Sequence, residues 1–126
     1  NKKITVFGGE QTRPNIHIKD IANVFLHFIK TEGQFTGIFN AGFENISILD
    51  IANKVAEQIP AEIVVTESND PRSYRLNSDK LVKTGFTPQY GVDYAIKEIM
   101  TAYQEGSLKD QDVNYNVKTM KKLIKL

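Results

Sequence analysis

An amphipathic helical pattern with a strand-like segment on each side constrains the fold more than any other feature of the sequence. Apolar residues recur along it at intervals of three and four, at Ile48, Ile51, Ala52, Val55 and Ile59. Ser47 and Asp50 give it a capping-box-like start, with Asp in place of the usual Glu, and Pro60 ends it. Residues 37–40 and 62–67 are predicted to be strands. The order strand, helix, strand predicts a parallel pair joined by a crossover, and therefore an α/β fold.

The segments before this unit predict two extended pieces and a helix. Residues 4–9 hold a β-rich run closed by a glycine pair, and residues 15–18 form a second extended piece. We expect the two pieces to form an irregular hairpin with Arg13 near its return. Residues 20–33 are predicted to form a helix closed by a glycine, because one apolar stripe runs along it: Ile21, Val24, Phe25, Phe28 and Ile29.

Three further helices are predicted in the second half of the chain. Asn77 is a good N-cap for a short helix that ends at Gly85, and residues 92–105 form an amphipathic helix. Residues 107–126 are predicted to be a helical tail. The chain of 126 residues is therefore expected to be a single domain over residues 1–126, with short strands and about four to five helices.

The tail has two possible interpretations. Apolar residues lie on one side of its helix and lysines largely on the other: Val117, Met120, Leu123 and Ile124 against Lys118, Lys121, Lys122 and Lys125. A short apolar stripe with a solvated polar face favours a terminal helix packed on its own domain. The alternative is a basic helix that binds a membrane surface or a nucleic acid.

Composition excludes several classes of protein. A net charge of +1 gives no field that would recruit nucleic acid, and the absence of cysteine rules out disulfides and thiolate metal sites. The apolar runs are far shorter than the roughly 18 residues that a membrane span needs. No signal-peptide pattern opens the chain, so we expect a cytoplasmic protein. Because the chain begins at Asn1 without a methionine, we expect it to be a piece of a longer one.

Arginine is confined to two short polar segments. Arg13 lies in residues 11–15, Arg72 and Arg75 lie in residues 70–75, and the basic residue is lysine everywhere else. A guanidinium grips phosphate or carboxylate bidentately, which lysine does not do. The distribution suggests a clamp for a phosphorylated ligand. The alternative is that each arginine caps a carbonyl or pairs with a neighbouring acid such as Asp70.

Asn45 is a further candidate binding residue. It lies in the loop that follows the predicted strand 37–40, and ligands of open α/β sheets gather at that edge. An amide can bridge a phosphate or a sugar hydroxyl. The alternative is that Asn45 is a turn or cap residue before Ser47.

No catalytic, cofactor-binding or metal-binding motif is present. The sequence has no glycine-rich phosphate loop and no serine-nucleophile motif, and it contains only two histidines. His17 is predicted to be structural, with an acid–base pair to Asp20 as the alternative. His27 lies off the apolar stripe and is expected to be exposed.

Three segments in the same order resemble one family of enzymes. Residues 7–22, with Arg13, Asp20 and Ala22, resemble an R-x-x-[IL]-x-V-x-D-x-A stretch, and residues 37–42 resemble a Y-N-x-G strand. Residues 72–88 resemble a segment that ends in L-G-[FW]-x-P. These are features of the extended short-chain dehydrogenases, the NAD-dependent epimerases and dehydratases of nucleotide sugars. The resemblance covers roughly residues 4–105 and concerns only their C-terminal, substrate-binding part.

The resemblance implies the roles of several residues. The family's arginine at the position of Arg13 contacts the pyrophosphate of the nucleotide sugar, and an asparagine at the position of Asn45 often assists. The family's second phosphate arginine corresponds to Glu67 here. That role is left to Arg72, with Arg75 as the weaker candidate.

The resemblance also implies a parent enzyme of which this chain is a portion. Its glycine-rich NAD loop and its Tyr-x-x-x-Lys pair would lie upstream, in a Rossmann domain that is absent here. The reaction would begin with hydride transfer from the sugar to NAD. These 126 residues alone are expected to be inactive. The parent is expected to be a homodimer, and the portion is expected to expose an apolar patch and to self-associate. The rival interpretations are a stand-alone anion- or nucleotide-binding module and an assembly domain.

Overall fold

The computed structural model describes residues 2–124, and within that range it holds five α-helices, one 3₁₀ helix and four short strands. This mixed α/β composition confirms the predicted fold class. The chain divides into two compact units, residues 1–96 and residues 97–126. Lys125, which the sequence places on the polar side of the tail, lies outside the described residues.

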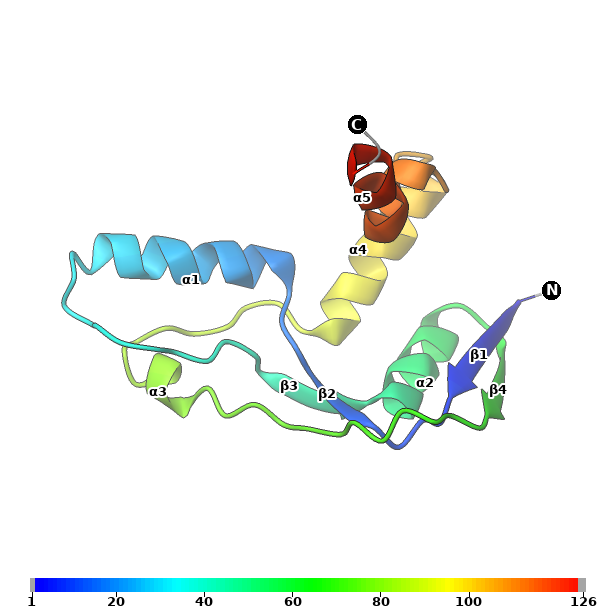
Figure 1. The fold of residues 1–126 in the computed structure, drawn as a ribbon, viewed down its shortest axis with the longest axis horizontal. Coiled ribbons are helices and arrows are strands. Elements are labelled where there is room, and N and C mark those ends of the chain that lie inside the picture. Colours follow the sequence, from blue (N-terminus) through cyan, green and yellow to red (C-terminus); the bar gives the residue numbers. More distant parts are fainter. Residues whose placement is uncertain (1, 125–126) are drawn as a thin grey trace. The chain divides into compact units, whose positions relative to one another are not determined.

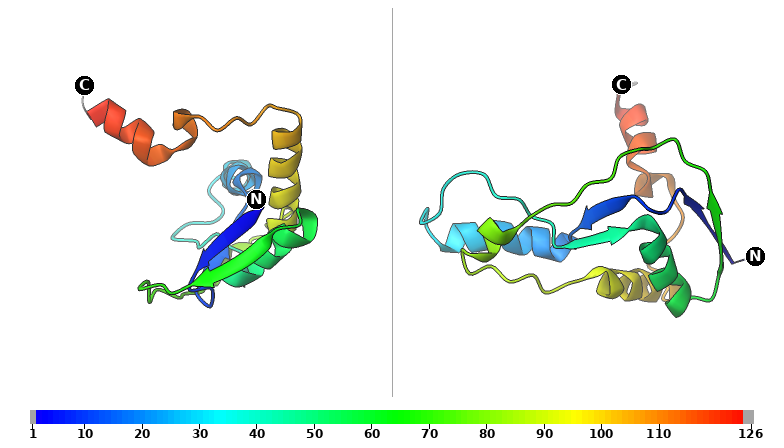
Figure 2. Two further views of the ribbon diagram at one scale, coloured as in Figure 1. Left: turned by 90° about the vertical axis from the view of Figure 1, so that its right-hand side faces the viewer. Right: turned by 90° about the horizontal axis from the view of Figure 1, so that it is seen from below.

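The first sheet is a parallel pair. Strand β1 (Lys3–Phe7) runs alongside β4 (Glu62–Thr66), with Lys3 opposite Glu62 and Phe7 opposite Thr66. Helix α2 (Ile48–Gln58) contacts both strands, and it lies next to them in Figure 1. Figure 2 shows the two strands lying along one another from two further directions. The parallel pair therefore joins β1 to β4 through a long connection, as parallel strands require, and the predicted parallel pairing of residues 37–40 with residues 62–67 is wrong.

The second sheet is an antiparallel pair. Strand β2 (Thr12–Asn15) pairs with β3 (Glu44–Ser47), with Arg13 opposite Ile46 and Pro14 opposite Asn45. Ser47 ends β3 and caps α2, because its hydroxyl accepts a hydrogen bond from the Asp50 N–H at 3.0 Å. The predicted cap of α2 is confirmed, and it fixes where the second sheet meets the helix.

The predicted hairpin between residues 4–7 and 15–18 is wrong. The β1 strand pairs with β4 and β2 pairs with β3, so the two segments belong to different sheets. Gly8 and Gly9 have φ of 79° and 108°, a left-handed conformation that redirects the chain at little cost only in glycine. The glycine pair was recognised as a turn, but a turn signal does not identify the partner of the strand that precedes it.

The predicted strand at residues 37–40 is also wrong. No described residue forms a ladder with this segment, and Ile38 is 87% exposed. The Ile38 carbonyl accepts a hydrogen bond from Lys80 Nζ at 2.8 Å, and the Asn40 side chain donates to Asn77 O at 3.2 Å. These single side-chain contacts hold the segment in place. They do not make it a β-strand, because a strand needs a neighbouring strand to pair its backbone groups.

Helix α1 (Ile18–Lys30) begins two residues earlier than predicted. His17 is its N-cap, and His17 Nδ1 accepts a hydrogen bond from Lys19 N at 3.2 Å. The helix ends before a turn in which Gly33 has φ of 79°. Along α1 only Asp20 is fully buried, while Phe25 and Ile29 are 68% and 70% exposed. The stripe is amphipathic as predicted, but most of it is left uncovered.

Helix α3 (Asp79–Val82) is short, and it is capped one residue later than predicted. Ser78 occupies the N-cap position, although Asn77 Oδ1 does accept a hydrogen bond from Asp79 N at 2.8 Å. Helix α4 (Val92–Gln104) confirms the amphipathic helix predicted for residues 92–105. In the second unit, a 3₁₀ turn (Asp112–Asn114) precedes helix α5 (Asn116–Ile124).

The buried core of the described residues is small, and only Leu81 and Asp20 in it are fully buried. Its apolar members are Val6, Ala52, Leu81 and Phe86, and its polar members are His17, Asp20 and Ser78. Asp20 accepts hydrogen bonds from the backbone N–H groups of Gln89 at 3.0 Å and Tyr90 at 2.9 Å. This buried carboxylate ties α1 to the connector before α4, because each N–H satisfies a charge that burial would otherwise make costly.

Candidate functional site

The two arginine-bearing segments lie side by side. The Thr12 N–H donates to Ser73 Oγ at 3.0 Å, and Tyr74 N donates to Thr12 O at 3.2 Å. The Arg13 guanidinium lies over the Tyr74 ring, with Cζ 5.2 Å from the ring centroid. The segments 11–15 and 70–75, far apart in the sequence, therefore form one surface with Arg13 and Arg72 at its centre.

Asp70 joins the two arginines. Its Oδ1 accepts hydrogen bonds from Arg72 Nε at 2.7 Å and from Arg72 N at 3.1 Å. Its Oδ2 accepts from Arg72 Nη2 at 2.8 Å and from Arg13 Nη2 at 3.3 Å. We call Arg13, Asp70 and Arg72 the arginine cluster. Both candidate ligand groups are paired with an acid, as the alternative interpretation of the sequence expected.

The cluster is anchored on its Arg13 side and open on its Arg72 side. Arg13 Nη1 donates to the backbone carbonyls of Thr12, at 3.0 Å, and of Arg72. The Arg13 side chain is 22% exposed, whereas the Arg72 side chain is 76% exposed. Arg13 is therefore a fixed cation, and Arg72 presents much of its guanidinium to solvent.

Electrostatics keep the cluster charged. Hydrogen bonds from the Arg72 side chain, and then from its backbone N–H, hold the pKa of the Asp70 carboxyl well below its usual range. The same contact with Asp70 raises the pKa of Arg72. Two guanidiniums and one carboxylate leave a net charge of +1 at neutral pH, which favours an anionic ligand.

Asn45 has a structural contact that uses both ends of its amide. Nδ2 donates to Leu76 O at 3.1 Å, and Oδ1 accepts from Leu76 N at 2.8 Å. In this way Asn45 fastens β3 to the segment that carries all three residues Arg72, Tyr74 and Arg75. The contact is structural, but Asn45 is neither the loop residue nor the turn or cap residue that the sequence suggested, because it lies within β3 and contacts a residue far along the chain.

Arg75 lies away from the arginine cluster. It is not part of that cluster and lines a hollow of about 410 Å³, together with Asn45, Phe43, Leu76 and Asp79 among others. The structure thus separates the two candidates for the second phosphate arginine. Arg72 lies with Arg13, and Arg75 does not.

The two histidines have structural contacts. His17 caps α1, and its ring packs against Tyr90 and Tyr94 with centroids 5.2 Å and 5.4 Å away. The expectation that His27 is simply exposed is wrong: it is half-buried, and its Nε2 lies 2.8 Å from Thr84 Oγ1. That contact links α1 to the end of the short helix α3, a pairing that spacing along the sequence does not reveal.

Two positioning residues were not identified from the sequence. The buried Ser78 hydroxyl donates to Gly42 O at 2.8 Å and accepts from Gly42 N at 3.0 Å. Glu44 Oε2 accepts from Val92 N at 2.6 Å and so caps the start of α4. An acid far upstream gives no sequence signal for capping a helix, since caps are recognised by adjacency.

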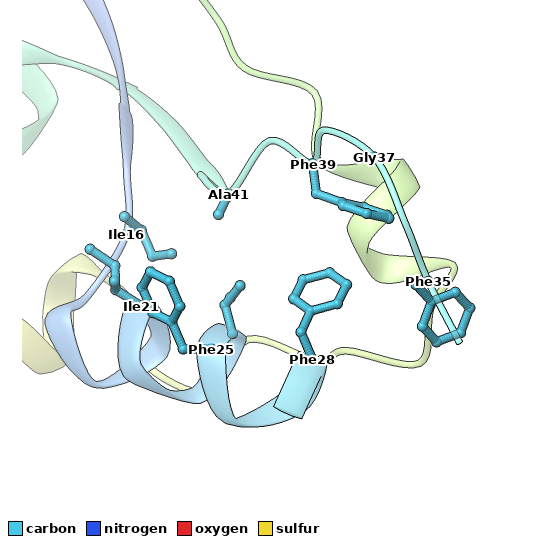
Figure 3. Close-up of a pocket in the computed structure, with 9 residues that line it drawn as sticks. Ile16, Ile21, Phe25, Phe28, Phe35, Gly37, Phe39 and Ala41 are labelled. Carbon is cyan, nitrogen blue, oxygen red and sulfur yellow. The ribbon is translucent and has the colours of Figure 1, made fainter. Parts of the chain in front are cut away.

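An apolar hollow of about 530 Å³ lies between α1 and residues 35–41. Figure 3 shows Ile21, Phe25 and Phe28 of α1 on one side and Phe35, Phe39 and Ala41 on the other. Phe28 and Phe39 meet across it with ring centroids 4.8 Å apart. This hollow is apolar throughout and does not supply the charged groups of a phosphate site.

Within residues 2–124 no group of three or more histidine, cysteine, aspartate or glutamate side chains is arranged to hold a metal ion. None of the helices described is both long enough and apolar enough to cross a bilayer.

No protein-family model matches the sequence. A UDP-glucose 4-epimerase from Streptococcus mutans is 32% identical in an alignment of 104 positions that covers 71% of this chain and 31% of that protein. The chain thus spans about a third of the curated relative it matches.

Two solved structures share the fold. RMD from Pseudomonas aeruginosa, solved in complex with NADPH, matches with a TM-score of 0.68 and 17% identity, over 82% of this chain and 36% of that one. The ADP-L-glycero-D-manno-heptose-6-epimerase of Helicobacter pylori matches with a TM-score of 0.63 and 19% identity, over 79% and 32%.

These two structural matches show that the chain has the α/β fold of part of a Rossmann-type epimerase. Together with the sequence relative, they support its assignment to the extended short-chain dehydrogenase/reductases, the family of NAD-dependent epimerases. The resemblance to this family that the sequence motifs indicated is confirmed.

Proposed function

We propose that this chain is the substrate-binding portion of an NAD-dependent epimerase or dehydratase that acts on a nucleoside-diphosphate sugar. The proposal rests on one observation: the guanidinium groups of Arg13 and Arg72 both donate a hydrogen bond to the same atom, Asp70 Oδ2. Two guanidiniums at one point suit a pyrophosphate, because each can donate to phosphate oxygens with a planar fork. The relative that acts on UDP-glucose supports the same ligand class.

Each residue of the site has a proposed role. Arg13, fixed by two backbone carbonyls, is the main phosphate donor. Arg72, mostly exposed, is the second donor and takes the role that the family gives to an arginine at the position of Glu67. Asn45 positions the segment through Leu76 and acts on the ligand indirectly. Arg75 stays a candidate for a neighbouring part of the ligand.

The described residues do not fit NAD. A dinucleotide pyrophosphate binds where a strand leads through a glycine loop into a helix N-terminus. The glycine pair Gly8-Gly9 follows β1 but leads into β2, so it offers no helix N-terminus. We therefore propose that a part of the enzyme outside these residues binds NAD, which when bound accepts the hydride. The structural relative solved with NADPH supports a nicotinamide cofactor for the parent.

Substitution of Arg13 tests the proposed function. In the full-length protein, Arg13→Lys should weaken the affinity for the nucleotide sugar by more than about tenfold, because lysine keeps the charge but loses the bidentate contact. Calorimetric titration with a panel of nucleoside-diphosphate sugars, beginning with UDP-glucose, measures the effect. An unchanged affinity in the Arg13→Lys variant would rule out the clamp.

Matched substitutions identify the second arginine. Arg72→Lys should weaken the same binding, and Arg75→Lys should leave it nearly unchanged, since Arg75 lies at a hollow that Arg13 and Arg72 do not line. Thermal unfolding of all three variants checks that the fold is intact. The opposite pattern would assign the second phosphate contact to Arg75.

The isolated chain provides a second test. It should be catalytically inactive and should not bind NAD, because it has neither the phosphate loop nor a Tyr-x-x-x-Lys pair. Titration with NAD measures this directly. Stoichiometric micromolar binding would show that the cofactor site lies within these residues, and it would favour a stand-alone nucleotide-binding module.

A further inference from the structure

We infer that helix α5 docks on the surface of a membrane that contains anionic lipids. In this arrangement its apolar side lies against the acyl chains just below the headgroups, and its lysines lie among the lipid phosphates. The helix has nine residues, so it lies on such a surface and is too short to cross it. The inference goes beyond the proposed function, because residues 97–126 contain no member of the arginine cluster.

Apolar and basic residues occupy opposite sides of α5. The apolar residues are Val117, Met120, Leu123 and Ile124, and the lysines are Lys118, Lys121 and Lys122. Because an α-helix completes a turn in about 3.6 residues, the apolar set falls within an arc of roughly 120° and the lysines within an opposite arc of roughly 100°. This separation is typical of helices that lie in the plane of a membrane interface.

The apolar side of α5 is exposed. Within the second unit the helix contacts the 3₁₀ turn Asp112–Asn114. The exposed fraction is 60% for Met120 and 79% for Ile124, and the values for Val117 and Leu123 lie between these two. Water around four apolar side chains on one short helix is unfavourable, so transfer of this side into an apolar phase would stabilise the bound state.

Positive charge is concentrated in the same part of the chain. Residues 107–126 hold five lysines and two aspartates, a net charge of +3, whereas residues 1–106 hold 11 basic and 13 acidic residues, a net charge of −2. The lysines therefore do not belong to a generally basic protein. A local excess of this kind attracts anionic headgroups, over a range of about 10 Å at moderate ionic strength.

Asp112 leaves this charge available. Its two carboxylate oxygens accept hydrogen bonds from Lys118 Nζ and from Lys122 Nζ, each at 3.0 Å. One carboxylate between two ammonium groups leaves one positive charge, and Lys121 adds another. All three side chains of the ion pairs are more than half exposed, and exposed pairs contribute little to stability, so a lipid phosphate can replace the carboxylate.

The kind of basic residue favours lipid over a protein partner. The polar side of α5 carries lysine alone, and the three arginines of the chain all lie elsewhere, at Arg13, Arg72 and Arg75. Interfaces between proteins are enriched in arginine and depleted of lysine. A lysine ammonium on a flexible stem reaches around an apolar surface to mobile phosphates without a fixed geometry. A second copy of α5 would oppose lysine to lysine.

Sedimentation with lipid vesicles tests the inference. The full-length protein should sediment with vesicles of equal parts phosphatidylcholine and phosphatidylglycerol, and much less with phosphatidylcholine alone. Leu123→Gln keeps helix propensity and should lower the partition by about tenfold or more, because a buried leucine is lost. Lys121→Gln should lower it by about fivefold, because each lysine near an anionic surface adds to binding. High salt should weaken binding of the wild type.

The matched control for charge is Lys30→Gln. Lys30 is exposed at the end of α1, in the first unit, so this variant makes the same change in net charge away from α5. It should leave the partition nearly unchanged. An equal loss in Lys30→Gln and Lys121→Gln would assign the effect to the net charge of the protein and would overturn the inference.

Four further outcomes also overturn it. Absence of binding, or equal binding to both kinds of vesicle, would show that anionic lipid is not recognised. An unchanged partition in Leu123→Gln would show adsorption by charge alone. A lower unfolding temperature of Leu123→Gln without vesicles would show that α5 packs on its own protein, as the sequence favoured. Tighter binding to duplex DNA than to vesicles, weakened by Lys121→Gln alone, would assign the lysines to nucleic acid.

Discussion

Asn45 and Leu76 are joined by two hydrogen bonds, from Asn45 Nδ2 to Leu76 O at 3.1 Å and from Leu76 N to Asn45 Oδ1 at 2.8 Å. The Asn45 amide thus satisfies the backbone N–H and carbonyl of Leu76, as a neighbouring strand would do, in the segment that carries Arg72 and Arg75. The segment that carries Arg72 therefore depends on a residue of β3 that lies opposite Pro14, next to the partner of Arg13 in the second sheet.

Removing this amide should destabilise the protein. Asn45→Ala leaves the N–H and the carbonyl of a half-buried residue unpaired, which should lower the free energy of unfolding by about 1–3 kcal/mol. Chemical denaturation measures the loss. Asn40→Ala is the control, because Asn40 makes one exposed contact, to Asn77 O. Equal stability of the two variants would contradict a structural role for Asn45.

Gly42 should not tolerate a side chain. A Cβ at this position would lie 2.9 Å from Leu76 Cδ2 and 3.2 Å from Pro14 Cβ. Gly42→Ala should therefore lower the free energy of unfolding by about 1–3 kcal/mol, because the site is too close-packed to accept it. The double variant Gly42→Ala/Leu76→Ala should lose less than the sum of the single losses. Strict additivity would show that the crowding against Leu76 is not the cause.

Among the buried polar residues, Asp20 should be the one whose substitution lowers the free energy of unfolding most. It is fully buried and accepts N–H groups from Gln89 and Tyr90. Asp20→Asn should cost about 2–4 kcal/mol of folding stability, because an amide cannot accept all of these contacts. Hydrogen exchange at the two donor amides should speed up. Asp93→Asn, at an exposed ion pair, should cost less than about 1 kcal/mol.

The pH dependence of Asp70 follows from its lowered pKa. A carboxyl whose pKa is depressed on folding contributes stability above its unfolded value and loses it as the pH falls towards the folded value. For Asp70 the loss should therefore occur only below its usual pKa of 3.8. Titration of the Asp70 carboxyl carbon by NMR measures this. Arg72→Ala should move the pKa back up, because Arg72 is the main cause of the shift.

Asp112 is the internal control for that titration. Its pKa is also lowered, by hydrogen bonds from Lys122 and Lys118, in the second unit of the chain. Arg72→Ala should leave the Asp112 titration unchanged. A parallel shift of both carboxyls would show that the substitution acts through the general charge of the protein.

The sequence by itself determined the elements whose signals are local. Helix α2 with its Ser47 cap, helix α4 and strand β4 were predicted close to their observed bounds, because periodicity, capping and turn residues act over a few positions. The order of the family motifs was also readable, since it depends only on residue type and spacing. Arginine is concentrated in two segments that the fold places side by side, and the phosphate clamp inferred from them stays a prediction.

The tertiary structure alone decided which segments are partners. Residues 37–40 have the composition of a strand but pair with no strand of the described chain, whereas β1 pairs with β4, far along the sequence. Strand pairing is a non-local choice, because an extended segment satisfies its backbone groups only through another segment. Local composition does not identify that segment.

The tertiary structure also decided what each candidate site residue does. Sequence left Arg13 and Asn45 with two interpretations each, as ligand groups or as structural contacts. The fold brings Asp70 between Arg13 and Arg72, joins Asn45 to Leu76 by two hydrogen bonds, and places Arg75 with Asn45 at a hollow that Arg13 and Arg72 do not line. The reason is physical: hydrogen bonds and ion pairs depend on distances of about 3 Å between groups far apart in the chain, and only folding sets those distances.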